Sequence, residues 1–220
     1  MDLSGFEPLL HGGTIEKRYA RHAFFLTEDA APEYLGFVKE GIFREFSTDR
    51  DGKEYNKAFC FAGDLAGSYF GPPAGLLAEL PTKSVANPPA DLPAGSPSHP
   101  PDDPPAKPLA NPPAPRLSAA VQALTPGTLL LIPLAEFEQR VRTEETWLRA
   151  AHDLAHRLLM KKFQREYQLL TLSAEERYTL LETAHPQLIL EIPAFHLASY
   201  LGITPVSLSR LRNTRKHKNL

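Results

Sequence analysis

The sequence predicts an α+β fold in which antiparallel strands come first, a long helix follows, and two short helices end the chain. Three observations support this prediction. Short segments rich in aromatic and branched residues alternate with turn residues up to position 61. After Pro133 the apolar period becomes helical, and near the C-terminus two short helical segments flank a Gly-Ile-Thr turn.

The first strands are expected at residues 34–38, 42–46 and 54–61, with Asp49-Arg50-Asp51-Gly52 as the turn between the last two. Gly in such a turn can adopt a positive φ, so these strands form an antiparallel hairpin. A further strand is expected at residues 128–133. We assign residues 1–143 to this β domain.

Proline accounts for 22 of the 220 residues, and fifteen of these prolines lie between Pro72 and Pro115. Proline cannot donate a ladder hydrogen bond or continue a helix, so residues 72–115 are predicted to be a disordered, extended insertion in the β domain. We favour a flexible spacer. The alternative is a segment that docks on a proline-reading protein.

The composition limits the chemistry. A single cysteine, Cys60, excludes an intrachain disulfide, a cysteine-built zinc site and an iron–sulfur cluster held within one chain, and its strand pattern is typical of a buried thiol. The N-terminus has no basic signal sequence and no apolar run reaches the ~18 residues of a membrane span, so we expect a cytoplasmic protein without a membrane partner. Without a Gly-rich phosphate loop or a paired-His motif, we expect neither an enzyme nor a metal site.

A short helix is expected at residues 134–141 and a long one at 144–170, where apolar residues recur at a spacing of about 3.5. A second stripe runs through Leu159, Phe163 and Tyr167. We interpret one stripe as packing on the β domain and the other as contacting a second copy, with a single core helix as the alternative. The residues assigned to dimerisation are Leu148, Ala151, Ala155, Leu158 and Lys162.

Ser173 and Glu176 form a capping box that begins a helix ending before His185. Two helices then follow, one that begins with Pro193 at its first position and ends at Leu201, and one at 205–213. They are joined at Gly202 as a helix-turn-helix. The apolar contacts expected to lock this pair are Leu197, Ala198, Leu201, Ile203, Val206, Leu208 and Leu211.

The outward face of the second helix and the tail after it are polar and basic, and no acid follows Glu191 although the formal net charge of the chain is −2. Arginine can reach guanine O6 and N7 or a phosphate, so this surface predicts DNA binding, with an ordinary αα-hairpin as the alternative. The residues assigned to DNA are Thr204, Pro205, Ser207, Ser209, Arg210, Arg212, Arg215 and Lys216.

At residues 192–211 the sequence reads Leu-Ala-x-x-Leu-Gly-Ile-Thr and then Ser-Leu-Ser-Arg-Leu, which resembles the helix-turn-helix of the Crp/Fnr family. Phe37–Gly41, Asp51–Glu54 and Gly63–Ser68 are similar to that family's cyclic-nucleotide-binding-type β roll. The resemblance implies a bacterial transcription regulator that binds double-stranded DNA as a homodimer and contacts RNA polymerase. Residues 144–170 would be the dimerisation helix, and 171–220 the DNA-binding domain.

The sequence departs from the family at several places. Val206 stands where many members carry an acid, and after Asn213 there is no room for most of the family's wing. An effector pocket would involve Gly67, Ser68, Arg116 and Ser118, but Ser68 replaces the carboxylate that binds a ribose.

We therefore expect no cyclic-nucleotide binding, and the effector is unknown. We find no pattern for haem sensing, and His196 is interpreted as a surface or turn-packing residue. The alternative function is a β-roll interaction module that uses the Pro-rich loop, with a vestigial helix-turn-helix.

Overall fold

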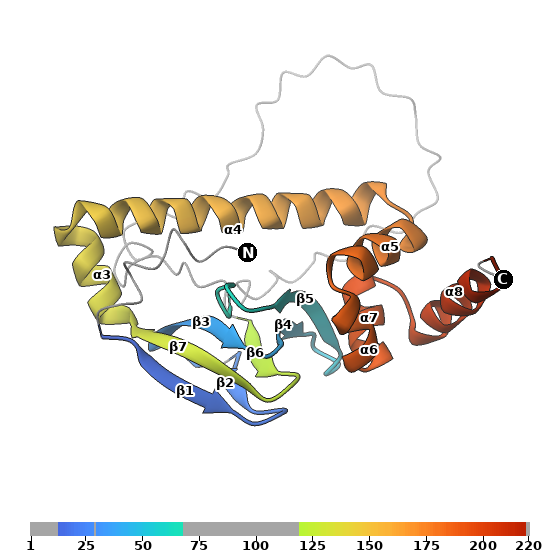
Figure 1. Ribbon diagram of the computed structural model, residues 1–220, viewed down its shortest axis with the longest axis horizontal. Coiled ribbons are helices and arrows are strands. Elements are labelled where there is room, and N and C mark those ends of the chain that lie inside the picture. Colours follow the sequence, from blue (N-terminus) through green and yellow to red (C-terminus); the bar gives the residue numbers. More distant parts are fainter. Residues whose placement is uncertain (1–12, 29, 68–118, 219–220) are drawn as a thin grey trace, which may run out of the picture. The chain divides into compact units, whose positions relative to one another are not determined.

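The computed structural model describes residues 13–28, 30–67 and 119–218. Its strands form two antiparallel sheets, one in the order β1-β7-β3 and the other in the order β2-β6-β4-β5 (Figure 1). The strands are β1 (Ile15–Tyr19), β2 (Phe24–Leu26), β3 (Tyr34–Glu40), β4 (Phe43–Thr48), β5 (Glu54–Cys60), β6 (Ala120–Ala123) and β7 (Gly127–Pro133). The predicted α+β class is confirmed.

Strands β1, β2 and β6 were not predicted. Strand β2 has only three residues, and the other two were missed for different reasons. The first four residues of β1 are exposed, and this edge strand therefore lacks the alternation that a half-buried strand has. All four residues of the short β6 are buried, so no polar face marks it as a strand.

Both sheets contribute to one apolar core. Val38, Phe43 and Leu129 are fully buried in it, and Tyr19 meets Phe43 edge to face with ring centroids 5.9 Å apart. Cys60 lies in the same core, as its strand pattern predicted, and burial raises the pKa of its thiol to about 12.

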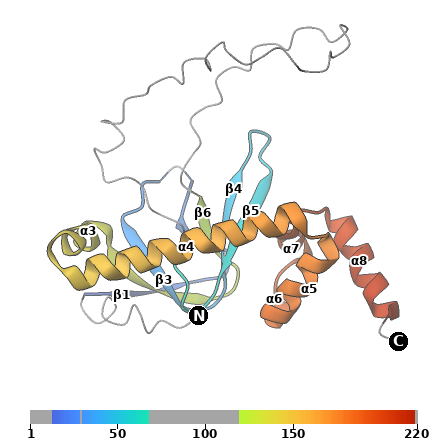
Figure 2. The same cartoon turned by 90° about the horizontal axis from the view of Figure 1, so that it is seen from above.

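Helix α3 (Leu134–Thr143) leads into α4 (Glu145–Thr171), whose 27 residues span about 40 Å. Figure 2 shows α4 running across the strands. Trp147, Ala150 and Leu154 are its buried residues and belong to a core cluster with Leu35 and Phe37 of β3. One face of α4 therefore packs on the β domain, and the long helix predicted for this segment is present.

Four helices follow, namely α5 (Ala174–Ala184), α6 (Pro186–Glu191), α7 (Ala194–Leu201) and α8 (Pro205–Lys218). Both bonds of the capping box between Ser173 and Glu176 are present, as predicted. Helix α6 was not predicted. Helix α8 continues five residues beyond the expected end at 213, because nothing in Asn213–Lys218 stops a helix.

The core of these helices is shared with the β domain. Leu188, Leu197, Leu201 and Leu208 are fully buried in one cluster. That cluster also contains Ile42, Phe59 and Leu124 from the β domain. No helix within the described ranges is apolar over a length that could cross a membrane.

Candidate nucleic-acid interface

The turn between α7 and α8 is built from backbone geometry that its residues favour. Gly202 has a φ of 70°, a left-handed conformation in which a side chain is strained, and the Ile203 N–H donates to the Ala198 carbonyl at 3.0 Å. Thr204 then caps α8, since its Oγ1 accepts the Ser207 N–H at 3.1 Å. Pro205 at the first helical position needs no donor. The helix-turn-helix predicted for these residues is therefore present.

Helix α8 presents one face to solvent and buries the other. Leu208 is fully buried and Leu211 packs against the same core. Five of the residues predicted to bind DNA lie together on the exposed side, namely Thr204, Pro205, Ser207, Ser209 and Arg210. The side chain of Lys216 lies outside the part of the chain that the structure describes.

Val206 and Arg212 lie on the faces opposite to those predicted. Val206 is 60% exposed, whereas Arg212 is half-buried with its guanidinium 5.7 Å from the centre of the Tyr178 ring. Helix geometry explains this exchange. Arg212 is four residues from the buried Leu208 and shares its face, whereas Val206 is two residues from Leu208 and lies on the opposite face. The prediction that Val206 helps to lock the two helices together is therefore wrong, and so is the prediction that Arg212 points outward toward DNA.

The buried guanidinium of Arg212 is incompletely satisfied. Its Nε and Nη2 have no hydrogen-bond partner among the described residues. Arg212 also lines a 210 Å³ cavity together with Ala194 at the start of α7 and with Ser209 and Asn213. An arginine at this core-facing position therefore carries an energetic cost that an apolar residue would avoid.

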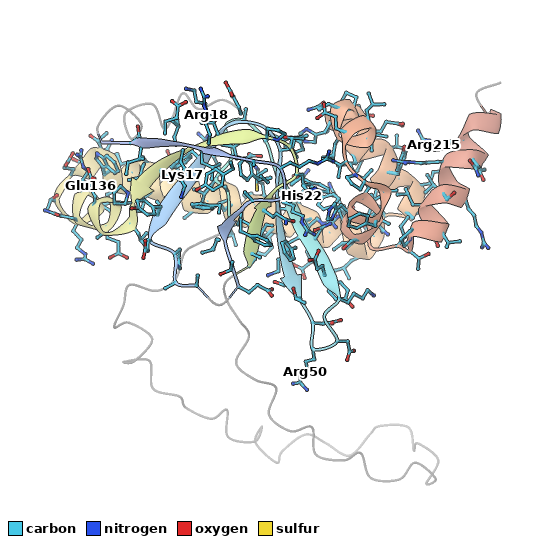
Figure 3. The ribbon with its side chains drawn as sticks, turned by 90° about the horizontal axis from the view of Figure 1, so that it is seen from below. Lys17, Arg18, His22, Arg50, Glu136 and Arg215 are labelled. Carbon is cyan, nitrogen blue, oxygen red and sulfur yellow. The ribbon has the colours of Figure 1, made fainter. Side chains whose placement is uncertain are left out.

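Arg215 points from α8 toward the neighbouring helices rather than away from the protein (Figure 3). Its Nη2 lies 2.8 Å from Glu182 Oε2, and its Nη1 donates to the Thr179 hydroxyl, both on α5. The guanidinium also lies 5.2 Å from the centre of the Tyr178 ring. Arg215 thus ties α8 to α5, which differs from the free basic tail expected from the sequence.

His196 on α7 is buried, at 4% exposure, which excludes the surface position among the two roles, surface or turn-packing, that the sequence indicated. Arg44 on β4 donates from Nη1 to His196 Nδ1 at 3.1 Å, and Asn56 on β5 donates from Nδ2 to the His196 carbonyl at 2.9 Å. Since arginine only donates, Nδ1 carries the lone pair and His196 is neutral. Burial first, and then the Arg44 charge, lower the pKa of His196 to about 4.

Arg44 is itself held by further partners of the sheet. Gln122 Oε1 accepts from its Nε at 2.9 Å and from its Nη2 at 2.7 Å, and Glu54 Oε2 lies 2.6 Å from its Nη1. Ser199 on α7 adds a contact, because its Oγ accepts the Asn56 N–H at 2.9 Å. The first helix of the helix-turn-helix is therefore hydrogen-bonded to the β4–β5 hairpin.

The exposed apolar stripe of α4 is rotated from the predicted one. Ala151 and Leu158 are half-buried against the β domain, whereas Leu148 is exposed. Ala155 is half-buried and Lys162 exposed. The large apolar side chains that α4 exposes are Leu148, Leu159, Met160, Phe163, Tyr167, Leu169 and Leu170.

The effector pocket inferred from the sequence is described only at Gly67. Its φ is 94°, and a Cβ there would lie 3.0 Å from a methyl group of Val121. Ser68, Arg116, Ser118 and the whole Pro-rich segment 72–115 lie outside the described residues. In the ranges that are described, no group of His, Cys, Asp and Glu side chains is arranged to hold a metal ion.

Two sheets, a long helix and a helix-turn-helix in this order define the fold of Crp/Fnr regulators, which the resemblance in the sequence implied. FixK2 from Bradyrhizobium japonicum superimposes with a TM-score of 0.67 at 19% identity, over 94% of this chain and 86% of its own. A transcriptional regulator of the Crp/Fnr family from Eubacterium rectale gives 0.63 at 13% identity, over 99% and 85%. The c-di-GMP responsive regulator CLP of Xanthomonas campestris gives 0.58 at 14% identity, over 100% and 94%.

Comparisons that use the sequence alone found no match. No family model matches the chain, and no curated protein matches it. The similar structures named above are those of transcription regulators rather than enzymes.

Proposed function

We propose that this chain is a DNA-binding transcription regulator of the Crp/Fnr type that binds double-stranded DNA as a homodimer through α8. The observation that carries the proposal is the exposed face of α8. It presents Arg210 between hydroxyl groups, follows a capped turn, and includes no acidic residue. The fold shared with solved transcription regulators supports the same conclusion.

The chemistry of this face suits the major groove of DNA. A recognition helix contacts base edges with the residues of its N-terminal part, while the preceding helix crosses the backbone. Arg210 lies in the second turn of α8 and its exposed guanidinium can bind guanine O6 and N7. We assign phosphate contacts to the Thr204, Ser207 and Ser209 hydroxyls.

The homodimer is proposed from the exposed stripe of α4. Leu159, Phe163 and Tyr167 recur four residues apart and are each more than half exposed. Leu170 continues the stripe at 78% exposure. Leu159 and Leu170 are eleven residues apart, so the stripe covers about 17 Å of the helix. An apolar stripe of this kind suits a parallel copy of the same helix, since a two-fold axis pairs identical surfaces.

The remaining parts of the proposal follow from the fold and the sequence. A regulator of this type works in the bacterial cytoplasm and contacts RNA polymerase. We do not assign a cyclic nucleotide as its effector, because Ser68 replaces the acid that would bind the ribose.

DNA binding is tested with the full chain and a pool of random-sequence duplexes at low salt, where phosphate contacts are strongest. We expect an enriched sequence, and fluorescence anisotropy then compares Arg210→Ala with the wild type. The variant should lose about 1–3 kcal/mol on the enriched duplex. Arg18→Ala on β1, an exposed arginine remote in sequence from α8, serves as control and should bind normally. Failure to retain any duplex at low salt would refute the proposed function.

Dimerisation is tested by sedimentation equilibrium on Phe163→Glu, which places a charge in the middle of the α4 stripe. We expect the wild type to sediment as a dimer and the variant as a monomer. Leu190→Glu is the matched control, because Leu190 is 86% exposed on α6 and lies outside the stripe. A monomeric wild type, or a dimeric Phe163→Glu, contradicts this part of the proposal.

A further inference from the structure

The first turn of α8 presents an apolar end to solvent. Pro205 is exposed, and Val206 is 60% exposed, although the core takes Leu208 and Leu211 from the same helix. The neighbouring hydroxyls are partly used within the turn, since Thr204 Oγ1 and Ser207 Oγ share a hydrogen bond of 2.9 Å. Val206 is thus the side chain of this turn that can offer only methyl groups.

Val206 and Arg210 lie on one stripe of α8. They are four residues apart, which places them on the same face about 6 Å apart along the helix axis. Both are exposed, and Leu208 between them points to the opposite side. A surface that brings Arg210 to a base edge therefore brings Val206 to a neighbouring base edge in the same groove.

Base chemistry decides what Val206 can contact. In the major groove, guanine and adenine present acceptors or donors, cytosine presents an amino donor, and only thymine presents a methyl group at C5. A valine placed over a donor or acceptor would remove its water without replacing the hydrogen bond, which is unfavourable. Over the thymine methyl it buries apolar surface instead.

We propose that Val206 selects a thymine, through its C5 methyl group, beside the base that Arg210 contacts in each half-site. This inference rests on the proposed function, because it requires α8 to enter the major groove. Val206 is then a specificity-determining residue that binds by apolar contact, at a position that the sequence alone assigned to the core of the helix pair.

The experiment uses the full chain and the duplex enriched from the random pool. Each dT of the duplex is replaced in turn by dU, which removes only the C5 methyl, and affinity is measured by fluorescence anisotropy. At one position of each half-site we expect dU to weaken binding about fourfold, the equivalent of one buried methyl group. As a control, each dC of the duplex is replaced in turn by 5-methylcytosine, which adds a C5 methyl group at positions that have none. These duplexes should not bind more tightly than their parent.

The assignment to Val206 is tested with Val206→Ala, which leaves a helix-favouring residue at an exposed position and should fold normally. This variant keeps only the Cβ methyl and should discriminate between the dT and dU duplexes less than the wild type does, while Leu190→Ala keeps the fourfold preference. The inference is overturned if every dU duplex binds as well as its dT parent, or if Val206→Ala discriminates as strongly as the wild type. The inference alone is refuted if duplexes are retained without an enriched sequence, or if the enriched sequence tolerates dU throughout. Failure to retain any duplex at low salt refutes the proposed function and with it the inference.

Discussion

The neutral His196 makes the stability of the protein depend on pH. In the folded state the pKa of His196 is about 4, below its ordinary value of 6.5, because the ring is buried and faces Arg44. The unfolded chain therefore binds this proton more readily than the folded chain does. The stabilisation is complete above about pH 6.5 and is lost as the pH falls toward 4.

The shift converts to about 3 kcal/mol in total, of which about 2 kcal/mol is lost between pH 7 and pH 5. His196→Asn removes the titration and leaves a carbonyl oxygen close to where Nδ1 accepts from Arg44. Urea unfolding at pH 7 and pH 5 should show a free energy of unfolding that falls by about 2 kcal/mol more in the wild type than in this variant.

His152→Asn is the matched control, since the His152 side chain is 79% exposed on α4. It should follow the wild type at both pH values when all proteins are measured at one concentration. If His196→Asn and the wild type lose the same free energy between pH 7 and pH 5, burial and the Arg44 contact do not hold His196 neutral and the reasoning is refuted.

Three further predictions concern single residues. Arg212→Leu should leave the melting temperature unchanged or raise it, because it removes two buried nitrogens without partners; a fall equivalent to more than about 1 kcal/mol would contradict this. Gly202→Ala should cost about 1 kcal/mol in urea unfolding, since the φ of 70° strains any side chain; an unchanged midpoint would argue against that strain. Cys60, with a pKa of about 12, should react with a thiol reagent at pH 8 far more slowly in the folded protein than in urea, and equal rates would exclude the burial that the structure describes.

Features that depend on neighbouring residues could be predicted from the sequence. Ser173 and Glu176 satisfy each other's backbone groups three residues apart, and Gly202 and Thr204 end one helix and begin the next by local geometry. For the same reason, α7 ends at Leu201 as predicted, although Pro193 lies at the N-cap rather than at the first helical position.

Features that depend on the direction of a side chain or on distant partners could not be predicted. Residue type suggested that Val206 packs inside and Arg212 faces water. Because Leu208 is the buried residue of this helix, the core lies on the side of Arg212 and Val206 faces solvent instead. Arg44 and His196 lie 152 residues apart in sequence, and nothing near either one indicates the other. The face of α4 that packs on the β domain likewise depends on β3, which the helix sequence does not contain.

The ion pair between Arg215 and Glu182 limits how the protein gains affinity for DNA. A cation displaces a counterion from DNA when it binds a phosphate. An arginine that is already paired with a carboxylate can do this only after its ion pair has broken. Arg215 therefore adds little to the salt dependence of binding, and the positive charge of α8 is smaller than its sequence suggests. Within the described part of α8, discrimination between DNA sequences consequently depends on contacts to bases more than on the attraction that any duplex would provide.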